Sequence, residues 1–345
     1  MLRALFQRAT PMSFCFRPVA LLIAFTLTLL VACASGGPAP DAIAPAPKPV
    51  AVKPVRIGIA LGGGAAKGFA HIGVIKMLEA NGLRIEVVSG TSAGSVVGAL
   101  YASGMDAFQM QKTAFGLDEA QIRDVSLFSG GVVKGQKLQD YVNQLVGNRR
   151  LERMKKPFAV VSTQLETGER TVFVRGNTGQ AVRASSSIPG VFEPVAIGQK
   201  HYVDGGEVSP VPVDAARQLG ADFVIAVDIS TKASGRNPGS LLGTVNQSIA
   251  IMGEKLGQQE LARANVVIRP LVNDIGPADF EQRNNAIMEG ERATLAVMPQ
   301  IRAQLAKLRA EREVAAMPRV PASEPCKPAR FGGLFGKKCA DAGKD

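Results

Sequence analysis

The chain has 345 residues, of which 46% are hydrophobic and 20% charged, enough for one large globular domain or two smaller ones. It contains no tryptophan and only 5% aromatic residues, which argues against a site that stacks bases or sugars. The net charge of +11 comes from scattered Lys and Arg with no run of five or more, and it favours an anionic membrane surface over nucleic acid.

The first 32 residues have the organisation of a signal peptide. Arg3, Arg8 and Arg17 precede an apolar run at residues 19–32, and no acidic residue lies in the whole segment. An apolar run of about 14 residues is too short for a comfortable transmembrane helix, which needs roughly 20. We therefore expect residues 1–32 to be removed from the mature protein.

The apolar run ends in Leu-Val-Ala-Cys at residues 30–33, which resembles the lipobox of bacterial lipoproteins. The resemblance implies cleavage before Cys33 and lipidation of that cysteine, which would anchor the chain in the bacterial cell envelope. Ala34 is not acidic, which in this class implies sorting to the outer membrane, facing the periplasm. The alternative is an ordinary signal peptide that contains a cysteine.

Two segments of low complexity flank the expected domain at residues 55–312. Lipidated Cys33 and the Pro- and Ala-rich residues that follow are predicted to form a semi-extended tether, residues 33–54. Residues 313–345 are predicted to be a basic, disordered tail. In an oxidising periplasm Cys326 and Cys339 of this tail could form a disulfide, or they could remain free thiols.

Strands rich in Val and Ile alternate with helical stretches over residues 55–311. This alternation predicts an α/β fold with three layers, α/β/α, around a mainly parallel central sheet. Active sites of such sheets lie beyond the carboxyl ends of the strands, and we expect Ser92 and Asp204 to follow two such ends. Residues 105–155 are less regular and are interpreted as a lid. The predicted strands are residues 55–61, 85–89, 158–164, 170–175, 200–206, 223–229 and 265–270, and the last long helix is predicted at 286–311.

A glycine loop, "LGGGAAKGFAHIGV" at residues 61–74, follows the first strand and opens a helix. Such a loop exposes backbone N–H groups beside a helix N-terminus and suits an anion. It does not fit a nucleotide, because Lys67 precedes Gly68 instead of following a glycine, and the dinucleotide spacing fails by one residue. The amides of Gly62, Gly63, Gly64 and Ala65 could instead form an oxyanion hole, or the loop could be a plain connection.

The next strand runs into "VVSGTSAGSVVGAL" at residues 87–100, which contains the G-x-S-x-G pattern of a nucleophile elbow. Ser92 lies at its corner, between Gly90 and Gly94. A serine hydroxyl is a poor nucleophile until a base removes its proton. Small residues at this spacing also mark close helix packing, so the pattern gains meaning from the glycine loop beside it.

The base is not expected to be histidine, because the chain has only two. His71 lies well inside the helix after the glycine loop, where we expect it to pack or cap locally. His201 is expected to be structural or exposed, because residues 201 and 204 of an extended strand face opposite ways. Asp204, in Asp204-Gly205-Gly206, is left as the base. A carboxyl pKa of about 3.9 is too low for this task, but burial would raise it.

The motifs "GGGAAKG", "GTSAG" and "DGG", in this order and spacing, resemble those of the bacterial patatin-like phospholipases. The resemblance covers roughly residues 55–260 and implies a patatin-like fold and a Ser–Asp dyad without histidine. It assigns Ser92 as the nucleophile, Asp204 as the general base and the glycine loop as the oxyanion hole. Lys67 matches the basic residue of the family loop. The supporting motif residues are Lys67, Gly68, Gly90, Gly94, Gly205 and Gly206.

The predicted function is a serine acyl hydrolase that cleaves phospholipids, lysophospholipids or related lipid esters through an acyl-enzyme on Ser92. The expected partners are a membrane lipid or lipid-like substrate and the membrane itself, with no nucleic acid, metal or other cofactor. The alternatives are a non-catalytic lipid-binding or scaffold lipoprotein that keeps the fold, and a nucleotide-binding protein, which the glycine spacing disfavours. The choice of lipid, the oligomeric state and the pairing of Cys326 with Cys339 stay open.

Overall fold

The computed structural model describes residues 52–124, 133–232 and 239–317. The predicted signal segment, Cys33, almost all of the tether and both tail cysteines lie outside these residues. Within them, no helix is both long and apolar enough to cross a membrane.

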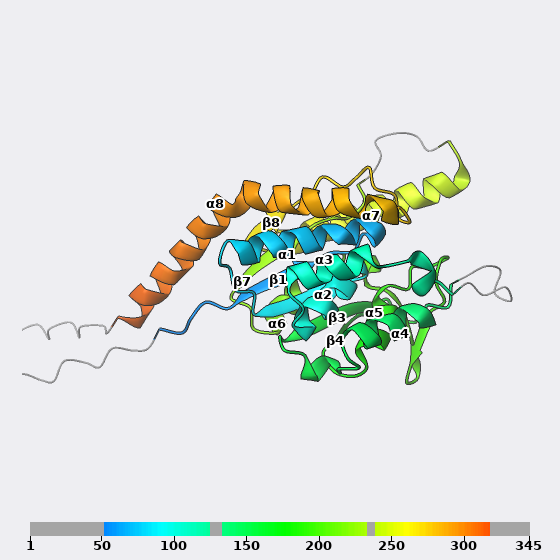
Figure 1. Ribbon diagram of the computed structural model, residues 1–345, viewed down its shortest axis with the longest axis horizontal. Coiled ribbons are helices and arrows are strands. Elements are labelled where there is room, and N and C mark those ends of the chain that lie inside the picture. The colour runs from blue at the N-terminus through cyan, green and yellow to red at the C-terminus, as the bar shows by residue number, and fades with distance from the viewer. Residues whose placement is uncertain (1–51, 125–132, 233–238, 318–345) are drawn as a thin grey trace, which may run out of the picture. The chain divides into compact units, whose positions relative to one another are not determined.

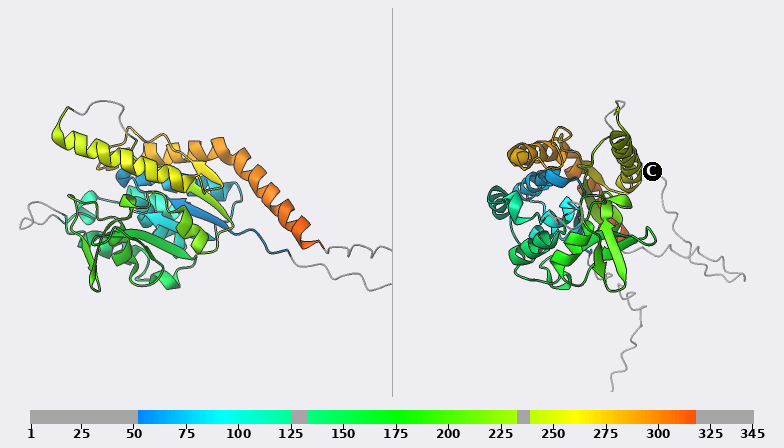
Figure 2. Two further views of the ribbon diagram at one scale, coloured as in Figure 1. Left: turned by 180° about the vertical axis from the view of Figure 1, so that it is seen from behind. Right: turned by 90° about the vertical axis from the view of Figure 1, so that its right-hand side faces the viewer.

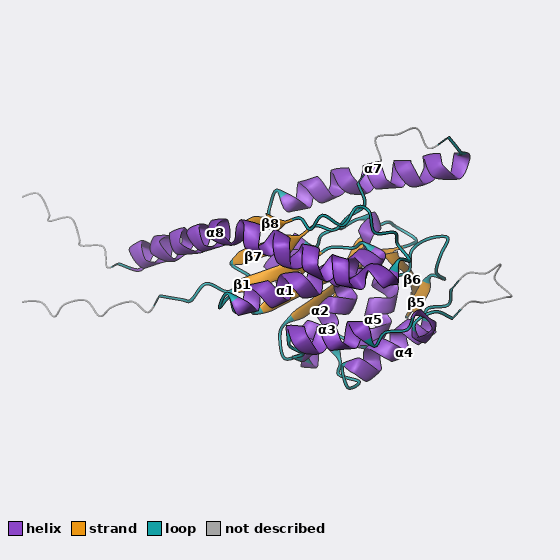
Figure 3. Cartoon of the chain, turned by 45° about the horizontal axis from the view of Figure 1, so that its top comes forward, coloured by secondary structure: helices purple, strands orange, loops and turns teal. Residues whose placement is uncertain are grey.

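An eight-stranded sheet forms the middle layer (Figures 1 and 3). Strands β8, β7, β1, β2 and β3 are parallel neighbours, whereas β4 and β6 pair with β3 antiparallel and β5 pairs with β6 antiparallel. The strands are β1 (Ile57–Leu61), β2 (Val87–Thr91), β3 (Phe158–Gln164), β4 (Arg170–Phe173), β5 (Val195–Ile197), β6 (Lys200–Asp204), β7 (Phe223–Val227) and β8 (Val266–Ile268). The path across the sheet is β5-β6-β3-β2-β1-β7-β8, with β4 beside β3.

Helices cover both faces of the sheet, which confirms the predicted three-layer α/β/α fold. One core lies between the sheet and α1 (Ala70–Ala80), α2 (Ala93–Ser103), α3 (Ala107–Phe115), α4 (Gln136–Leu145) and α8 (Arg283–Ala316). A second core lies on the other face, beneath α6 (Val213–Gln218) and the end of α7 (Leu241–Leu261). Helix α7 stands in front of the sheet in the rear view, where α1 and α8 lie behind it (Figure 2). Helix α5 (Thr178–Ser185) packs near β5 and β6.

The central strands are apolar because side chains on both of their faces are covered. On β1, Ile59 and Leu61 pack into the first core and Ala60 into the second, and all three are fully buried. A strand buried on both faces has no polar face to show, which is the pattern of parallel sheets. This packing fixes β1 and β2 side by side and brings the loops at their carboxyl ends together.

Helix α8 is longer than predicted, since it spans Arg283–Ala316. Pro299 lies inside it, and a proline removes one helical hydrogen bond and bends the axis. Figure 1 shows α8 bending along its length. The helix therefore runs past the sheet and reaches beyond its amino edge.

The interpretation of residues 105–155 as an irregular lid is wrong for the part that the structure describes. Helices α3 and α4 are regular, and they bury Met110 and Val142 completely in the first core. The sequence hides this because both helices are short and carry polar residues on their outer faces. Residues 125–132, also within the predicted lid, lie outside the described residues.

Candidate active site

Ser92 forms a sharp corner between β2 and α2. Its backbone has φ 51° and ψ −125°, which is rare for a residue with a side chain and typical of a nucleophile elbow. The turn is tight enough that a Cβ on Gly90 would overlap the backbone of Gly94, and one on Gly94 would overlap the backbone of Leu61. Both glycines of the pattern are thus required by close packing around the corner.

The corner is held from two sides by other serines. The Ser92 N–H donates to Ser185 Oγ at 2.9 Å, and the Ser185 hydroxyl donates to the carbonyl of Val161 on β3. Ser95 Oγ donates to the Ser92 carbonyl at 2.6 Å. Ser92 is only 5% exposed. Its backbone is therefore fixed and its side chain is largely shielded from water.

Asp204 reaches the same region from a direction that the sequence did not predict. It ends β6, which runs antiparallel to β3 and pairs Asp204 with Ser162. The expectation that Asp204 follows the carboxyl end of a parallel strand is therefore wrong. Strand β6 enters from the carboxyl edge of the parallel strands and ends near the level of Ser92. The Asp204 N–H donates to the Ser187 carbonyl at 2.9 Å, and Thr163 Oγ1 donates to the Asp204 carbonyl at 2.8 Å.

The Asp204 carboxyl is buried beside the Ser92 hydroxyl. Burial raises the pKa of Asp204 to about 7, against the opposing effects of the Ser92 hydroxyl and the Gly206 N–H. Oδ1 accepts from Gly206 N–H at 2.7 Å, and Oδ2 has no well-aligned hydrogen bond to the described residues. The Ser92 hydroxyl thus acts on the pKa of Asp204 without an aligned hydrogen bond to it, as is common before substrate binds.

The glycine loop lies directly beside this pair, since a Cβ on Gly63 would be 3.2 Å from Ser92 Cβ. The Gly62 and Gly63 amides already donate to the carbonyls of Val227 and Pro210, both at 3.0 Å. The Gly64 and Ala65 amides have no acceptor among the described residues. Of the four amides predicted as oxyanion donors, the first two therefore hold the loop against its neighbours, and the assignment of Gly64 and Ala65 stays a prediction.

Lys67 and Gly68 of the loop motif are held by contacts within the fold. Lys67 is 3% exposed, and its ammonium donates to Thr231 Oγ1 at 3.0 Å. Burial and the nearby Lys232 lower the pKa of Lys67, while Asp228 raises it. Gly68 packs on Ala93, where an added Cβ would clash.

The two histidines have the surroundings that the sequence predicts, one packed inside the fold and one on the surface. His71 is fully buried, and its Nε2 lies 2.8 Å from the Gly62 carbonyl. Burial lowers the pKa of His71 to about 4, so the ring is neutral and Nε2 carries the proton that it donates. His201 is exposed, with Nδ1 2.8 Å from Glu166. His71 therefore supports the loop and His201 lies on the surface.

Sequence reasoning missed the residues that hold the pair in place. Ser185 and Ser187 occur in the run Ala-Ser-Ser-Ser-Ile-Pro-Gly, whose three consecutive serines were the available signal. Ser209 donates its N–H to the Gly205 carbonyl at 2.8 Å, in the turn after Asp204. No local pattern marks this serine.

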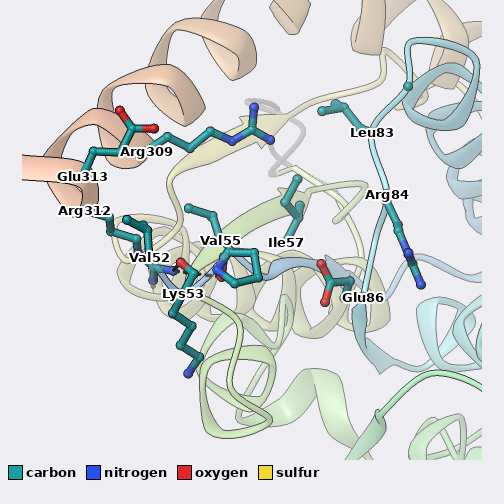
Figure 4. A pocket seen from close by; sticks show the side chains of 12 residues that line it. Val52, Lys53, Val55, Ile57, Leu83, Arg84, Glu86, Arg309, Arg312 and Glu313 are labelled. Atoms are coloured by element: carbon teal, nitrogen blue, oxygen red, sulfur yellow. Dashed lines mark hydrogen bonds between the residues drawn. The ribbon is translucent and has the colours of Figure 1, made fainter. Parts of the chain in front are cut away.

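A pocket of about 430 Å³ lies at the opposite, amino edge of the sheet (Figure 4). The segment before β1, the loop before β2 and the last turns of α8 line it. Here Arg312 donates to the carbonyls of Lys53 and Pro54 at 3.1 and 3.0 Å and pairs with Asp222 at 2.7 Å. The pocket contains none of the predicted site residues. It marks the place where the chain enters the domain.

The family model described as patatin-like phospholipase matches residues 59–217. Residues 59–217, slightly less than half of the chain, are thus similar to a patatin-like phospholipase domain. This range holds the glycine loop, the elbow and Asp204, and it ends within α6.

Proteins similar to this part of the chain occur in bacteria and eukaryotes. An uncharacterized NTE family protein of Mycobacterium tuberculosis is 35% identical over 182 residues, which is 52% of this chain and 51% of the relative. The lysophospholipase NTE1 of Pyricularia oryzae is 32% identical over 181 residues, 51% of this chain and 12% of the relative. The chain thus spans about half the length of the mycobacterial relative. Among solved structures, VipD from Legionella pneumophila is 16% identical with a TM-score of 0.49, covering 72% of this chain and 67% of that one.

Proposed function

We propose that the chain is a lipid acyl hydrolase in which Ser92 is the nucleophile and Asp204 the general base. The observation that carries the proposal is the buried Asp204 carboxyl, whose pKa is raised to about 7 and on which the Ser92 hydroxyl acts. The family match and the lysophospholipase relative support the reaction class. A carboxyl with a pKa near neutrality can take up and return a proton within one turnover.

The reaction follows from the positions of these groups. Asp204 takes the proton from Ser92 Oγ, which attacks the ester carbonyl of the lipid. The Gly64 and Ala65 amides stabilise the oxyanion, because they are the loop amides without an acceptor among the described residues. The protonated Asp204 then gives its proton to the leaving alcohol, and the acyl group stays on Ser92. Water attacks this acyl-enzyme, giving its proton to Asp204 as the fatty acid leaves, and Asp204 reprotonates Ser92.

The substrates are phospholipids, lysophospholipids or related lipid esters. Two measurements on the purified chain test the proposal: release of fatty acid from lipid vesicles or mixed micelles, and covalent labelling of Ser92 by a fluorophosphonate probe. A non-catalytic scaffold would give neither signal.

The pH profile follows from the pKa of Asp204. Only the ionised carboxylate can accept the serine proton, so kcat/KM should rise as pH passes through about 7 and level off above it. At about pH 5 the rate should be roughly 100-fold below the plateau, since only about 1% of a group with this pKa is then ionised. A profile that is flat between about pH 5 and 8 would contradict the assignment of the base.

The free energy of unfolding should fall as pH rises over the same range in which activity increases. The folded-state pKa of Asp204 lies above the unfolded value, so its contribution to stability is present below the unfolded pKa and lost as pH rises through about 7. Unfolding in urea, followed across this range, would show the fold weakening while activity increases.

We also propose that Cys33 is lipidated and holds the chain on the bacterial envelope. The support is the sequence alone: charged residues, an apolar run and Leu-Val-Ala-Cys. Substitution Cys33→Ser should move the chain from the membrane fraction to the soluble fraction and abolish labelling with radioactive palmitate. Cys326→Ser, in the tail, is the matched control and should stay with the membrane. Palmitate incorporation unchanged in Cys33→Ser would exclude the anchor.

A further inference from the structure

One short segment, residues 209–212, contacts all three motifs of the site. The Ser209 N–H donates to the carbonyl of Gly205, in the turn that follows Asp204. The Ser209 carbonyl accepts from Thr91 Oγ1 at 2.8 Å, and Thr91 directly precedes the nucleophile. The Pro210 carbonyl accepts the Gly63 N–H of the glycine loop at 3.0 Å. The position of the 209–212 segment thus sets the distances between base, nucleophile and loop.

Glu260, near the end of α7, holds this segment through two hydrogen bonds. Its Oε1 accepts the Ser209 hydroxyl at 2.6 Å, and its Oε2 accepts the Val211 N–H at 3.1 Å. The residue is 4% exposed. Both carboxyl oxygens therefore bind the 209–212 segment, although Oε1 also lies 3.7 Å from Arg170 Nη1, and the side chain has almost no contact with water.

Burying the Glu260 carboxyl at this position costs free energy. Burial raises the pKa of Glu260 to about 7, and the bonds from Ser209 and Val211 and the charge of Arg170 counteract it only in part. Asp214, which lies close, raises the pKa further. An apolar side chain would avoid this cost, but it could not accept an O–H and an N–H at once. The residue type thus matches the two donors that converge on it.

We propose that Glu260 is a positioning residue of the reaction, which holds the 209–212 segment so that Asp204, Ser92 and the loop amides stay in register. The inference rests on the proposed acyl hydrolase function. Glu260 touches neither reacting group, so it acts on them through Ser209 and Val211. A misplacement of about 1 Å at a reacting centre can lower a rate by about 100-fold.

The test compares Glu260→Ala, Glu260→Gln and Ser209→Ala in the full-length chain. The readouts are kcat and KM on a p-nitrophenyl ester, the rate of fluorophosphonate labelling and the melting temperature. Glu260→Ala should lower kcat and the labelling rate about 100-fold with KM changed less than about 3-fold. Glu260→Gln should recover most of kcat, because an amide can accept the Val211 N–H and donate to Ser209 Oγ. It should also retain the pH inflection of Asp204.

Asn265→Ala is the matched control for simple destabilisation. Asn265 Oδ1 accepts the Val224 N–H at 2.8 Å, which is also a hydrogen bond from a backbone amide to a side-chain oxygen but lies at the amino end of β7. Asn265→Ala should lower the melting temperature while leaving kcat within about 3-fold. If Glu260→Ala fails to fold, Ser209→Ala carries the same test, with a loss of kcat expected.

The outcomes separate the two claims. Folded Glu260→Ala or Ser209→Ala with wild-type kcat would overturn the positioning role and leave the acyl hydrolase proposal intact. The same holds if kcat falls only as much as it does in Asn265→Ala. A wild-type chain that neither hydrolyses esters nor labels at Ser92 would overturn both.

Discussion

Substitution Ser92→Ala is expected to lower ester hydrolysis by roughly 10⁶-fold, the scale seen when a nucleophilic serine is removed from a serine hydrolase. The side chain of Ser92 is the one that acts on buried Asp204, and it lies beside the glycine loop. Without its oxygen no acyl-enzyme can form. Alanine tolerates the backbone of the corner about as well as serine does, so the fold should persist. Fatty-acid release and active-site labelling should both fall to background.

Ser103→Ala is the matched control for this experiment. Ser103 is also buried on α2, and its hydroxyl donates only to the Leu100 carbonyl, at 2.7 Å. Loss of this hydroxyl should leave the rate unchanged within about 2-fold. Retention of more than about 1% of wild-type activity in Ser92→Ala would rule out Ser92 as the nucleophile.

Substitution Asp204→Asn is expected to lower kcat by roughly 10²–10⁴-fold, which is the usual contribution of a general base. The amide oxygen can still accept the Gly206 N–H, so the turn keeps its geometry, but the amide cannot take up a proton. KM should change little, because ground-state binding of the lipid does not use this proton. The rise of activity through about pH 7 should disappear from the residual rate.

Asp228→Asn tests whether any buried aspartate would behave in this way. Asp228 follows β7, is 4% exposed and accepts an N–H from the residue two positions later, as Asp204 does. Loss of its salt bridge to Lys232 should lower stability, whereas kcat should remain within about 3-fold of the wild-type value. Equal losses of kcat in both variants would mean that Asp204 acts through the fold and not as a base.

The sequence was most informative where chemistry and backbone geometry coincide within a few residues. The sharp corner at Ser92 was predictable because the elbow needs Gly90 and Gly94 beside it, and both make contacts that a side chain would prevent. The strand direction at Asp204 was not predictable, because the antiparallel pairing of β6 with β3 depends on contacts far apart in the chain. The Asp-Gly-Gly motif therefore indicated Asp204 as the candidate base but not the direction of the strand that carries it.

The glycine loop shows a second limit of the sequence analysis. Four consecutive residues looked alike as donors, yet Gly62 and Gly63 give their N–H groups to Val227 and Pro210, which follow much later in the chain. Glu260 left no local signal at all, since it lies in the ordinary helical sequence Gly-Gln-Gln-Glu-Leu. Its partners, Ser209 and Val211, become visible only when α7 lies on the second face of the sheet.

The chain enters the domain at the amino edge of the sheet, which determines the edge at which an N-terminal anchor would be attached. Arg312 fixes residues 53 and 54 at the end of β1 that lies opposite the loop beside Ser92. An anchor at Cys33 would therefore hold the domain by the edge that faces away from the reacting groups.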